Sequence, residues 1–359
     1  MSKYRRIVVK VGSNVLTRAD GTLDTTRMSA LVDQIARLHS EGIEVVLVSS
    51  GAVATGRSLM PQTNHLDSVS ARQLFSAVGQ VRLINRYYDL FGEWGIVCGQ
   101  VLTTKESLST RQDFLNQRNC MEVMLSNGVI PIVNENDTIS VTELMFTDND
   151  ELSGLVCAMM GADALIILSN IDGIYDGAPS SPTSTVIRRV ACGESLEQYI
   201  QTDRSSRGRG GMGTKSRISQ KVAAEGVEVV IANGTRDNIL TDLVLSAEDV
   251  VCTRFEPAPK TTSGVKKWIA HSEGFAKGAL HLNEGACRAI VESRAASILP
   301  IGVVEVEGNF ERDDIVRIID HNGVQIGVGR VTADSDKVRS VMGVRGEKPL
   351  VHYDYMFLD

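Results

Sequence analysis

The hydrophobic positions of this 359-residue chain follow two alternating patterns up to about residue 255. Short runs that are apolar at every position predict buried parallel strands, because a strand covered on both faces has no polar side. Longer stretches with apolar residues every three to four positions predict amphipathic helices. The predicted strands are 7–9, 45–48, 129–133, 165–168 and 229–231, and the predicted helices are 25–41, 70–94, 111–127, 150–160 and 213–225. This alternation predicts a three-layer α/β/α sandwich with a mostly parallel sheet.

A different pattern begins after Phe255. The segment from there to about Gly274 combines Pro, Gly, Thr and Lys without periodicity, which is typical of a linker. Beyond it the sequence predicts a short helix over 284–292 and strands over 302–307, 315–319, 325–331 and 350–353. Several short strands separated by turns predict a small C-terminal β-barrel. We therefore predict a large domain over 1–258, a linker over 259–274 and a small domain over 275–359.

Composition and charge narrow the possible classes of protein. Hydrophobic residues make up 43% of the chain and charged residues 23%, which excludes a disordered or fibrous protein. The net charge of −7 gives no overall attraction for nucleic acid. No run reaches the roughly 18 apolar residues of a membrane span, and the N-terminus lacks the apolar segment of a signal peptide. The six cysteines contain no C-x-x-C pair, so we expect reduced thiols and a cytoplasmic protein.

Small, polar and acidic residues follow most of the predicted strands. They are Lys10 and Gly12 after the first strand, Ser50 and Gly51 after the second, Asn134 to Asp137 and Asp148 to Asp150 after the third, and Ser169 and Asn170 after the fourth. Parallel strands end at the same edge of a sheet, and ligands bind at that edge. Each group alone has a plainer explanation, such as a strand-end lysine or an Asx turn. Their convergence favours a binding site.

Besides Lys10, the sequence has a second group of basic residues in the glycine-rich segment 204–217, which leads into a predicted helix. Glycine allows the backbone to approach a phosphate closely, and a helix start adds partial positive charge. The segment does not follow the P-loop pattern G-x-x-x-x-G-K-[ST]. A mobile surface loop has a similar composition, so the segment alone does not decide between a loop and a phosphate site.

Several kinds of chemistry find no support in the sequence. The six histidines show no metal-ligand spacing, and there is no G-x-S-x-G motif for a serine nucleophile. We therefore name no protein ligand for a metal. Asp137, Asp148 and Asp150 can hold an ammonium group, position lysines, or bind Mg²⁺ through water. The chemistry that these residues support is phosphoryl transfer by lysines, glycine-freed backbone donors and carboxylates.

The sequence resembles the glutamate 5-kinase family of the amino-acid kinase superfamily over nearly its whole length. The motifs that carry the resemblance are K-V-G-S at 10–13, V-S-S-G-A-V-A-T-G at 48–56, A-V-G-Q at 77–80, I-V-N-E-N-D at 132–137, D-N-D-E-L-S at 148–153 and G-G-M-G-T-K at 210–215. They occur in the order and spacing of that family. The C-terminal segments N-E-G-A at 283–286 and G-N-F-E-R-D-D at 308–314 resemble a PUA domain.

The resemblance implies a role for each matching residue. It implies catalysis by Lys10 and Lys215, with Asp150 orienting both lysines. The residues implied in glutamate binding are Ser50, Gly51, Asn134, Asp137, Asp148 and Asn149. The residues implied in nucleotide binding are Lys10, Gly12, Ser169, Asn170, Arg209, Gly210, Gly211, Met212, Gly213, Thr214 and Lys215. The chain departs from the family at Asn170 and Thr147, where the family commonly has Asp and Gly.

The resemblance also implies a reaction and its partners. Members of the family use ATP and Mg²⁺ to convert L-glutamate to γ-glutamyl phosphate, the first step of proline biosynthesis. Proline commonly inhibits them through the glutamate site. We accordingly expect a homodimer or homotetramer, and a downstream glutamyl-phosphate reductase as a partner. We expect no membrane partner.

Two alternative functions stay open at this level. The first is another kinase of the superfamily, acting on N-acetylglutamate, aspartate, carbamate or UMP. Asp137 and Asn149 favour a free α-amino group over an acetylated one. The second is an RNA-binding protein, because PUA-like barrels occur in RNA-modifying enzymes. From Phe275 onward the chain has 10 Lys and Arg against 13 Asp and Glu, so we do not expect nucleic acid as a partner.

Overall fold

The computed structural model describes residues 3–60, 66–108, 111–140, 146, 148–179, 181–196, 198–199, 211–246, 249–259, 269, 275–293 and 296–358. The chain forms two compact units. The first comprises residues 1–108 and 112–261, and the second contains Thr262–Asp359. No helix in the described ranges is long and apolar enough to cross a membrane.

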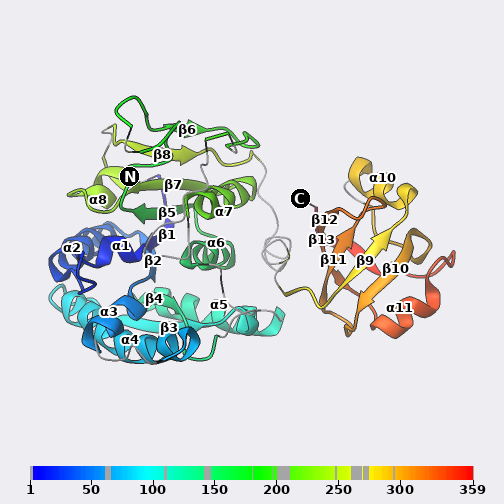
Figure 1. Cartoon of the computed structure of the whole chain (residues 1–359), viewed down its shortest axis with the longest axis horizontal. Helices are drawn as coiled ribbons and strands as arrows, with labels where there is room; N and C mark the ends of the chain where they lie inside the picture. The colour runs from blue at the N-terminus through cyan, green and yellow to red at the C-terminus, as the bar shows by residue number, and fades with distance from the viewer. Residues whose placement is uncertain are drawn as a thin grey trace. The chain divides into compact units, whose positions relative to one another are not determined.

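The first unit is built on an eight-stranded sheet (Figure 1). Its strands are β1 Arg6–Val11, β2 Glu44–Ser49, β3 Cys98–Thr103, β4 Ile130–Glu135, β5 Ala164–Ser169, β6 Arg189–Val190, β7 Glu228–Asn233 and β8 Cys252–Phe255. They lie in the order β3-β4-β2-β1-β5-β7-β8-β6. Every pair is parallel except β7 with β8. The carboxyl ends of β1, β2, β4, β5 and β7 therefore meet at one edge.

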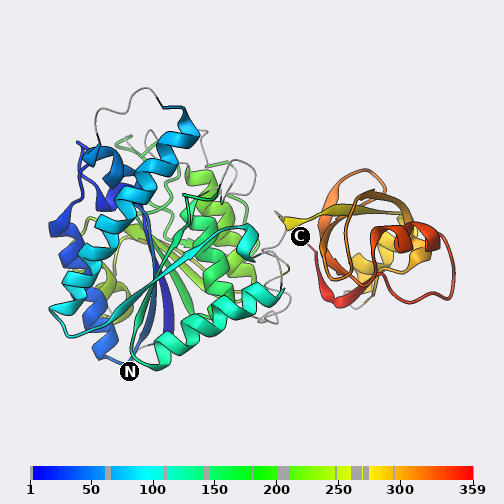
Figure 2. The same ribbon diagram turned by 90° about the horizontal axis from the view of Figure 1, so that it is seen from below.

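Helices cover both faces of this sheet, as Figures 1 and 2 show. They are α1 Ser13–Leu16, α2 Thr25–Ser40, α3 Ala52–Leu59, α4 Ser68–Gly92, α5 Arg111–Ser126, α6 Asn149–Met160, α7 Met212–Ala224 and α8 Ile239–Val244, with a 3₁₀ turn at Glu106–Leu108. One apolar core joins α2, α4 and α8 to the alternate side chains of β1, β2, β4 and β5. α6 and α7 pack on the opposite face. The predicted α/β/α sandwich with a mostly parallel sheet is confirmed.

Two glycines set the approach of α3 to α4. A Cβ atom on Gly56 would lie 1.9 Å from the carbonyl oxygen of Phe75. A Cβ atom on Gly79 would lie 1.8 Å from the carbonyl oxygen of Ala52. Only glycine permits backbones this close, so the two helices behave as one packed element. The sequence pattern predicted α4 but not α3, which begins directly after Gly51.

The second unit has its own five-stranded sheet in the order β10-β9-β11-β12-β13. The strands are β9 Gly278–Leu282, β10 Val303–Gly308, β11 Ile315–Ile319, β12 Gln325–Val331 and β13 Val351–Leu358, with helices α10 Glu284–Ser293 and α11 Ser335–Val341 and a 3₁₀ turn at Pro300–Gly302. Leu280, Val316, Ile318 and Val351 belong to a separate core. Of the predicted linker, residue 259 and Ile269 alone lie in the described ranges.

Candidate active site

A cavity of about 920 Å³ lies at the edge where the strands of the first sheet end. Residues after β1, β2, β4 and β5 line it, together with the starts of α3, α6 and α7. The sequence-predicted residues in its lining are Lys10, Gly12, Ser50, Gly51, Asn134, Asp137, Asp148, Asn149, Asp150, Ser169, Asn170, Gly211, Met212 and Lys215. The structure thus brings together residues from strands and loops that are far apart in the sequence.

The middle of the cavity holds a group of three buried charges, which we call the lysine–aspartate centre. Lys10 is the next-to-last residue of the central strand β1, and its Nζ lies 2.6 Å from Oδ1 of Asp150. Lys215, in the first turn of α7, places its Nζ 2.9 Å from Oδ2 of the same carboxylate. Asp150 is fully buried, while the Lys10 and Lys215 side chains keep 6% and 12% of their surface exposed. One carboxylate therefore holds both ammonium groups at the cavity wall.

The electrostatic environment of α6 differs between its two aspartates. Burial alone would raise the pKa of Asp150, but Lys10 and Lys215 outweigh burial and hold it below its usual range. Burial and the negative charge of Asp150 raise the pKa of Asp148 to about 6. Asp148 caps α6, because its Oδ1 accepts from the backbone N–H groups of Asp150 and Glu151. Its Oδ2 is buried and has no hydrogen-bond partner in the described part of the chain.

The side of the cavity formed by β2, β4 and α4, which we call the β2–β4 half, contains a chain of amide hydrogen bonds. Nδ2 of Asn149 donates to Oγ of Ser50 at 2.8 Å and to Oδ1 of Asn134 at 3.0 Å. Nδ2 of Asn134 in turn donates to Oε1 of Gln80 at 2.9 Å. Because the Ser50 hydroxyl accepts from Asn149, its hydrogen is left to donate to a ligand.

Asp137 completes the β2–β4 half together with a residue of α4. Nε and Nη2 of Arg72 lie 2.8 and 2.7 Å from Oδ1 of Asp137. The side chains are 13% and 14% exposed, and both line the cavity. Both contacts are to Oδ1, so Oδ2 of Asp137 is left to accept from a ligand.

Gly51 gives this half its shape. It has a φ of +106°, a left-handed conformation that side chains disfavour, and it caps α3. The tight turn places Ser50 at the carboxyl end of β2, directly before the N-terminus of α3.

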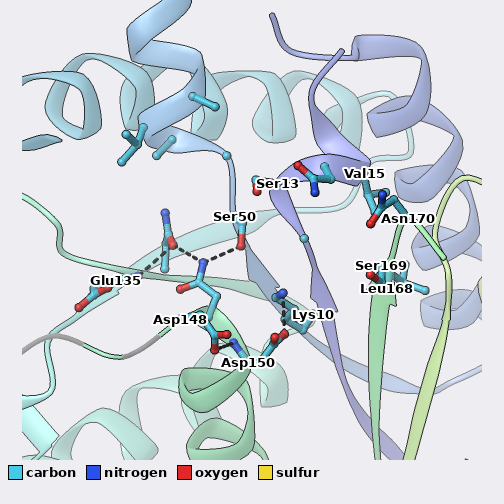
Figure 3. A pocket seen from close by; sticks show the side chains of 18 of the residues that line it. Lys10, Ser13, Val15, Ser50, Glu135, Asp148, Asp150, Leu168, Ser169 and Asn170 are labelled. Atoms are coloured by element: carbon cyan, nitrogen blue, oxygen red, sulfur yellow. Dashed lines mark hydrogen bonds and ion pairs between the residues drawn. The ribbon is translucent and has the colours of Figure 1, made fainter. Parts of the chain in front are cut away.

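The opposite side, which we call the β5–α7 half, has few charged side chains. Gly12, Ser169, Asn170, Gly211 and Met212 line it. Figure 3 shows Ser169 and Asn170 across the cavity from Ser50 and Asp148, with Lys10 and Asp150 between them. A Cβ atom on Gly12 would lie 3.6 Å from Nζ of Lys10 and 3.3 Å from the carbonyl oxygen of Leu168. Glycine thus keeps the space beside the lysine open.

Comparison with known proteins shows which family this chain belongs to. The profile of the amino acid kinase family matches residues 5–233, and that of the PUA domain matches residues 278–352. The chain belongs to the amino acid kinase family. The glutamate 5-kinase of Bacteroides thetaiotaomicron is 64% identical over 99% of both chains. That of Chlorobaculum tepidum is 46% identical over 99% of this chain and 98% of its own.

Two solved structures, a UMP kinase and a carbamate kinase, are similar to this chain in fold. A UMP kinase from Ureaplasma parvum superposes with a TM-score of 0.51 and 15% identity, covering 71% of this chain and 99% of its own. A carbamate kinase from Giardia lamblia bound to AMP-PNP gives a TM-score of 0.52 and 18% identity, covering 72% and 100%. At these identities the likeness concerns the fold alone.

Some predicted residues of this amino acid kinase lie outside the cavity lining or outside the described ranges. Gly213 and Thr214 lie in the first turn of α7 but not in the lining. Arg209, Gly210 and Thr147 lie outside the described residues. The described ranges contain no group of three or more His, Cys, Asp or Glu side chains that could hold a metal ion.

Sequence reasoning missed several residues of the amino acid kinase cavity. Arg57, Ser68 and Arg72 line it and were not identified, while Ser13, Asn14 and Glu135 follow predicted strands but were given no role. Gln80 contacts the site from α4 through Asn134. Its motif A-V-G-Q was recognised as part of the family resemblance, but no role followed for the glutamine. Arg72 stands in the helical pattern of 70–94, where the sequence gives no sign that its side chain reaches a strand end.

Proposed function

We propose that this chain transfers the γ-phosphoryl group of ATP to the side-chain carboxylate of L-glutamate. The products are L-glutamyl 5-phosphate and ADP, and the reaction is the first step of proline biosynthesis. The observation that carries the proposal is the lysine–aspartate centre, which lies between the β2–β4 half and the β5–α7 half. The 64% identity to a glutamate 5-kinase over the full chain supports the choice of substrate.

The reaction needs positioning and positive charge more than acid–base chemistry. One oxygen of the glutamate side-chain carboxylate attacks the γ-phosphorus, and the bond from that phosphorus to the β–γ bridging oxygen breaks. The electron pair leaves with ADP. The carboxylate is already ionised at neutral pH, so no general base is required. Lys10 and Lys215 donate to the phosphate oxygens, which carry the charge of the transition state.

Asp150 fixes the geometry of both lysines in this scheme. A lysine side chain has four rotatable bonds, and each ammonium would otherwise sample many positions. The contacts of 2.6 and 2.9 Å to one buried carboxylate hold both at the same point. Because Lys10 and Lys215 keep the Asp150 pKa low, the carboxylate stays ionised and holds both cations throughout the neutral pH range. We assign Asp150 a positioning role.

The β2–β4 half suits the amino acid. Ser50 can donate its hydroxyl hydrogen to a carboxylate, since Asn149 already donates to its oxygen. Oδ2 of Asp137 can accept from an ammonium group. Asn134 holds Asn149 in place through a 3.0 Å hydrogen bond. Gly51 and Asp148 border the same space.

The β5–α7 half suits the nucleotide. Gly12, Gly211 and Met212 expose backbone near Lys10 and Lys215, and Ser169 and Asn170 supply polar side chains. We place the nucleotide here, and we extend its contacts to Gly213, Thr214 and the segment from Arg209. Mg²⁺ bound with the nucleotide would neutralise phosphate charge. Oδ2 of Asp148 fits it, because Mg²⁺ usually takes one or two carboxylate oxygens and keeps its waters.

Other substrates of the fold are the competing proposal. The structural neighbours named above are a UMP kinase and a carbamate kinase. Uridine monophosphate and carbamate have no ammonium group, and N-acetylglutamate has a neutral amide in its place. Asp137 at the cavity wall favours a substrate with a free ammonium group. Aspartate keeps that group but is one methylene shorter.

Our proposal extends to regulation and organisation. Proline shares the α-carboxylate and ammonium of glutamate, which supports it as a feedback inhibitor at the same site. We propose a homodimer or homotetramer, and a reductase that consumes the labile acyl phosphate. The unpaired cysteines support a reducing cytoplasm. We assign residues 1–258 to the kinase domain, 259–274 to a linker and 275–359 to the PUA-like domain, in line with the two compact units.

A substrate panel tests the proposal. Purified protein with ATP and Mg²⁺ should release ADP in the presence of L-glutamate, and hydroxylamine should trap the acyl phosphate as a hydroxamate. The same assay with aspartate, N-acetylglutamate, carbamate and UMP gives the comparison, with and without proline. Turnover of one of these instead of glutamate would refute the substrate assignment.

A further inference from the structure

A cation and an anion lie side by side in the β2–β4 half. Arg72 and Asp137 are paired through contacts of 2.7 and 2.8 Å, and both side chains form part of the cavity wall. Arg72 also lies 3.4 Å from the carbonyl oxygen of Ser140 through Nη2. The pair is therefore accessible to a ligand in the cavity as well as attached to the segment after β4.

The attachment of α4 to residues 134–138 does not require the charge of Arg72. Nε2 of Gln73 donates to the carbonyl oxygen of Thr138 at 2.8 Å, and Oε1 of Gln80 accepts from Asn134 at 2.9 Å. These neutral contacts already join α4 to residues 134–138. The side chains of Arg72 and Asp137 are only 13% and 14% exposed. Burying such an ion pair carries a desolvation penalty that neutral contacts avoid. The charge at this point therefore calls for a function beyond anchoring.

The head group of an α-amino acid carries a carboxylate and an ammonium on one carbon atom. A protein cation and anion in direct contact present the complementary pair of charges at the same spacing. The planar guanidinium matches a carboxylate in geometry, and Oδ2 of Asp137 is left for the ammonium.

We propose that Arg72 binds the α-carboxylate of the amino-acid substrate while Asp137 binds its α-ammonium. Arg72 is then a specificity-determining residue that selects zwitterionic acids. The inference rests on the proposed function, because it takes the β2–β4 half as the amino-acid site.

Binding to the full chain tests the role of Arg72 without relying on turnover. Calorimetry with a non-hydrolysable ATP analogue and Mg²⁺ compares L-glutamate with 4-aminobutyrate, which lacks the α-carboxylate, and with glutarate, which lacks the ammonium. The wild type should bind glutamate about 10- to 100-fold more tightly than either analogue, the usual range for a charged hydrogen bond. In Arg72→Gln the preference over 4-aminobutyrate should vanish, while the preference over glutarate should remain.

The two preferences separate recognition from positioning. If Arg72 only positioned Asp137, which binds the ammonium, Arg72→Gln would lower the preference over glutarate and leave the preference over 4-aminobutyrate unchanged, and the proposal would be overturned. Arg72→Lys keeps the charge without the planar fork and should restore part of the preference over 4-aminobutyrate. Arg82→Gln removes the same charge from an exposed position of α4 and should change neither preference. If the wild type turned over glutamate but bound 4-aminobutyrate as tightly as glutamate, the proposed function would stand and the role of Arg72 would be overturned.

Discussion

The lysine–aspartate centre and the β2–β4 half adjoin in one cavity but are built in different ways. The centre consists of two long cationic side chains from β1 and α7 that meet on one buried carboxylate. The β2–β4 half consists of short side chains, Ser50, Asn134 and Asn149, joined by directional hydrogen bonds. The lysine–aspartate centre supplies charge at one point. The β2–β4 half supplies hydrogen-bond donors and acceptors at fixed positions around the cavity.

Under the proposed function, this difference predicts how binding and reaction are divided between the two regions. A transferring phosphoryl group develops charge on its oxygens, and it needs preorganised cations near them. An amino acid must be distinguished from other small acids, and this needs hydrogen bonds of defined direction. Changes in the centre should therefore act mainly on kcat, whereas changes in the β2–β4 half should act mainly on KM or Kd.

The largest effect is expected from the lysines. Lys215→Ala or Lys10→Ala should lower kcat by about 10²- to 10³-fold with little change in the KM for glutamate, because each removes a donor to the transition state. Steady-state ADP release measures both constants. Lys221→Ala, on α7 but outside the cavity lining, is the matched control. A near-normal kcat in either cavity variant, with the fold intact by circular dichroism, would refute its catalytic role.

A smaller and different effect is expected from Ser50. Ser50→Ala removes a hydroxyl that accepts from Asn149 at 2.8 Å and can donate to substrate. The KM for glutamate should rise about tenfold, the usual magnitude for one hydrogen bond, with kcat less affected. Ser58→Ala removes a hydroxyl from α3, the helix that follows Ser50, outside the cavity lining and serves as control. A fall in kcat at constant KM would contradict the division between the two regions.

A third effect concerns the stability of the ligand-free protein. The pKa of Asp148 is raised to about 6 in the folded protein, above its value near 3.9 in an unfolded chain. A raised pKa favours folding at low pH, and this contribution is lost as the pH rises through 6. Asp148→Asn keeps a good helix cap without the charge. The variant should therefore be more stable than wild type at pH 8, by roughly 1–2 kcal/mol in urea unfolding.

The pH dependence of the stability gain serves as the control for the Asp148→Asn prediction. The stability gain of Asp148→Asn should shrink as the pH falls from 6 toward 4. Asp67 caps α4 in the same way, but hydrogen bonds from Ser70 and Val69 lower its pKa. Asp67→Asn should thus bring no gain at pH 8, since an ionised Asp67 favours folding there. A gain for Asp148→Asn that is the same at every pH would contradict the role of its charge.

Much of the fold could be predicted because its central strands are buried on both faces. β1 and β5 are buried at every position, and their unbroken apolar runs indicated them. β3 was not predicted, because this edge strand has the half-exposed sequence Cys98–Thr103 with Gly and Gln among its residues. β8 was missed for a related reason, since its four residues include Thr and Arg.

The candidate site shows the same limit. Lys10, Ser50 and Asn134 could be found because residues at the carboxyl ends of parallel strands converge whatever their distance in sequence. Arg72 and Gln80 reach the site from the side of a 25-residue helix. Their positions follow from the packing of α4 against α3 through Gly56 and Gly79, and the sequence pattern carries no information about this packing.

The close joint between α3 and α4 bears on how this enzyme can be redesigned. Ser50 and Gly51 precede α3, and Arg72 lies on α4, so both walls of the proposed amino-acid pocket are tied to the closely packed pair of helices. A methyl group added at Gly56 or Gly79 would push the helices apart and widen the pocket without changing any residue that touches the ligand. Attempts to admit longer or branched acids should therefore leave these glycines alone and vary the side chains of the pocket itself.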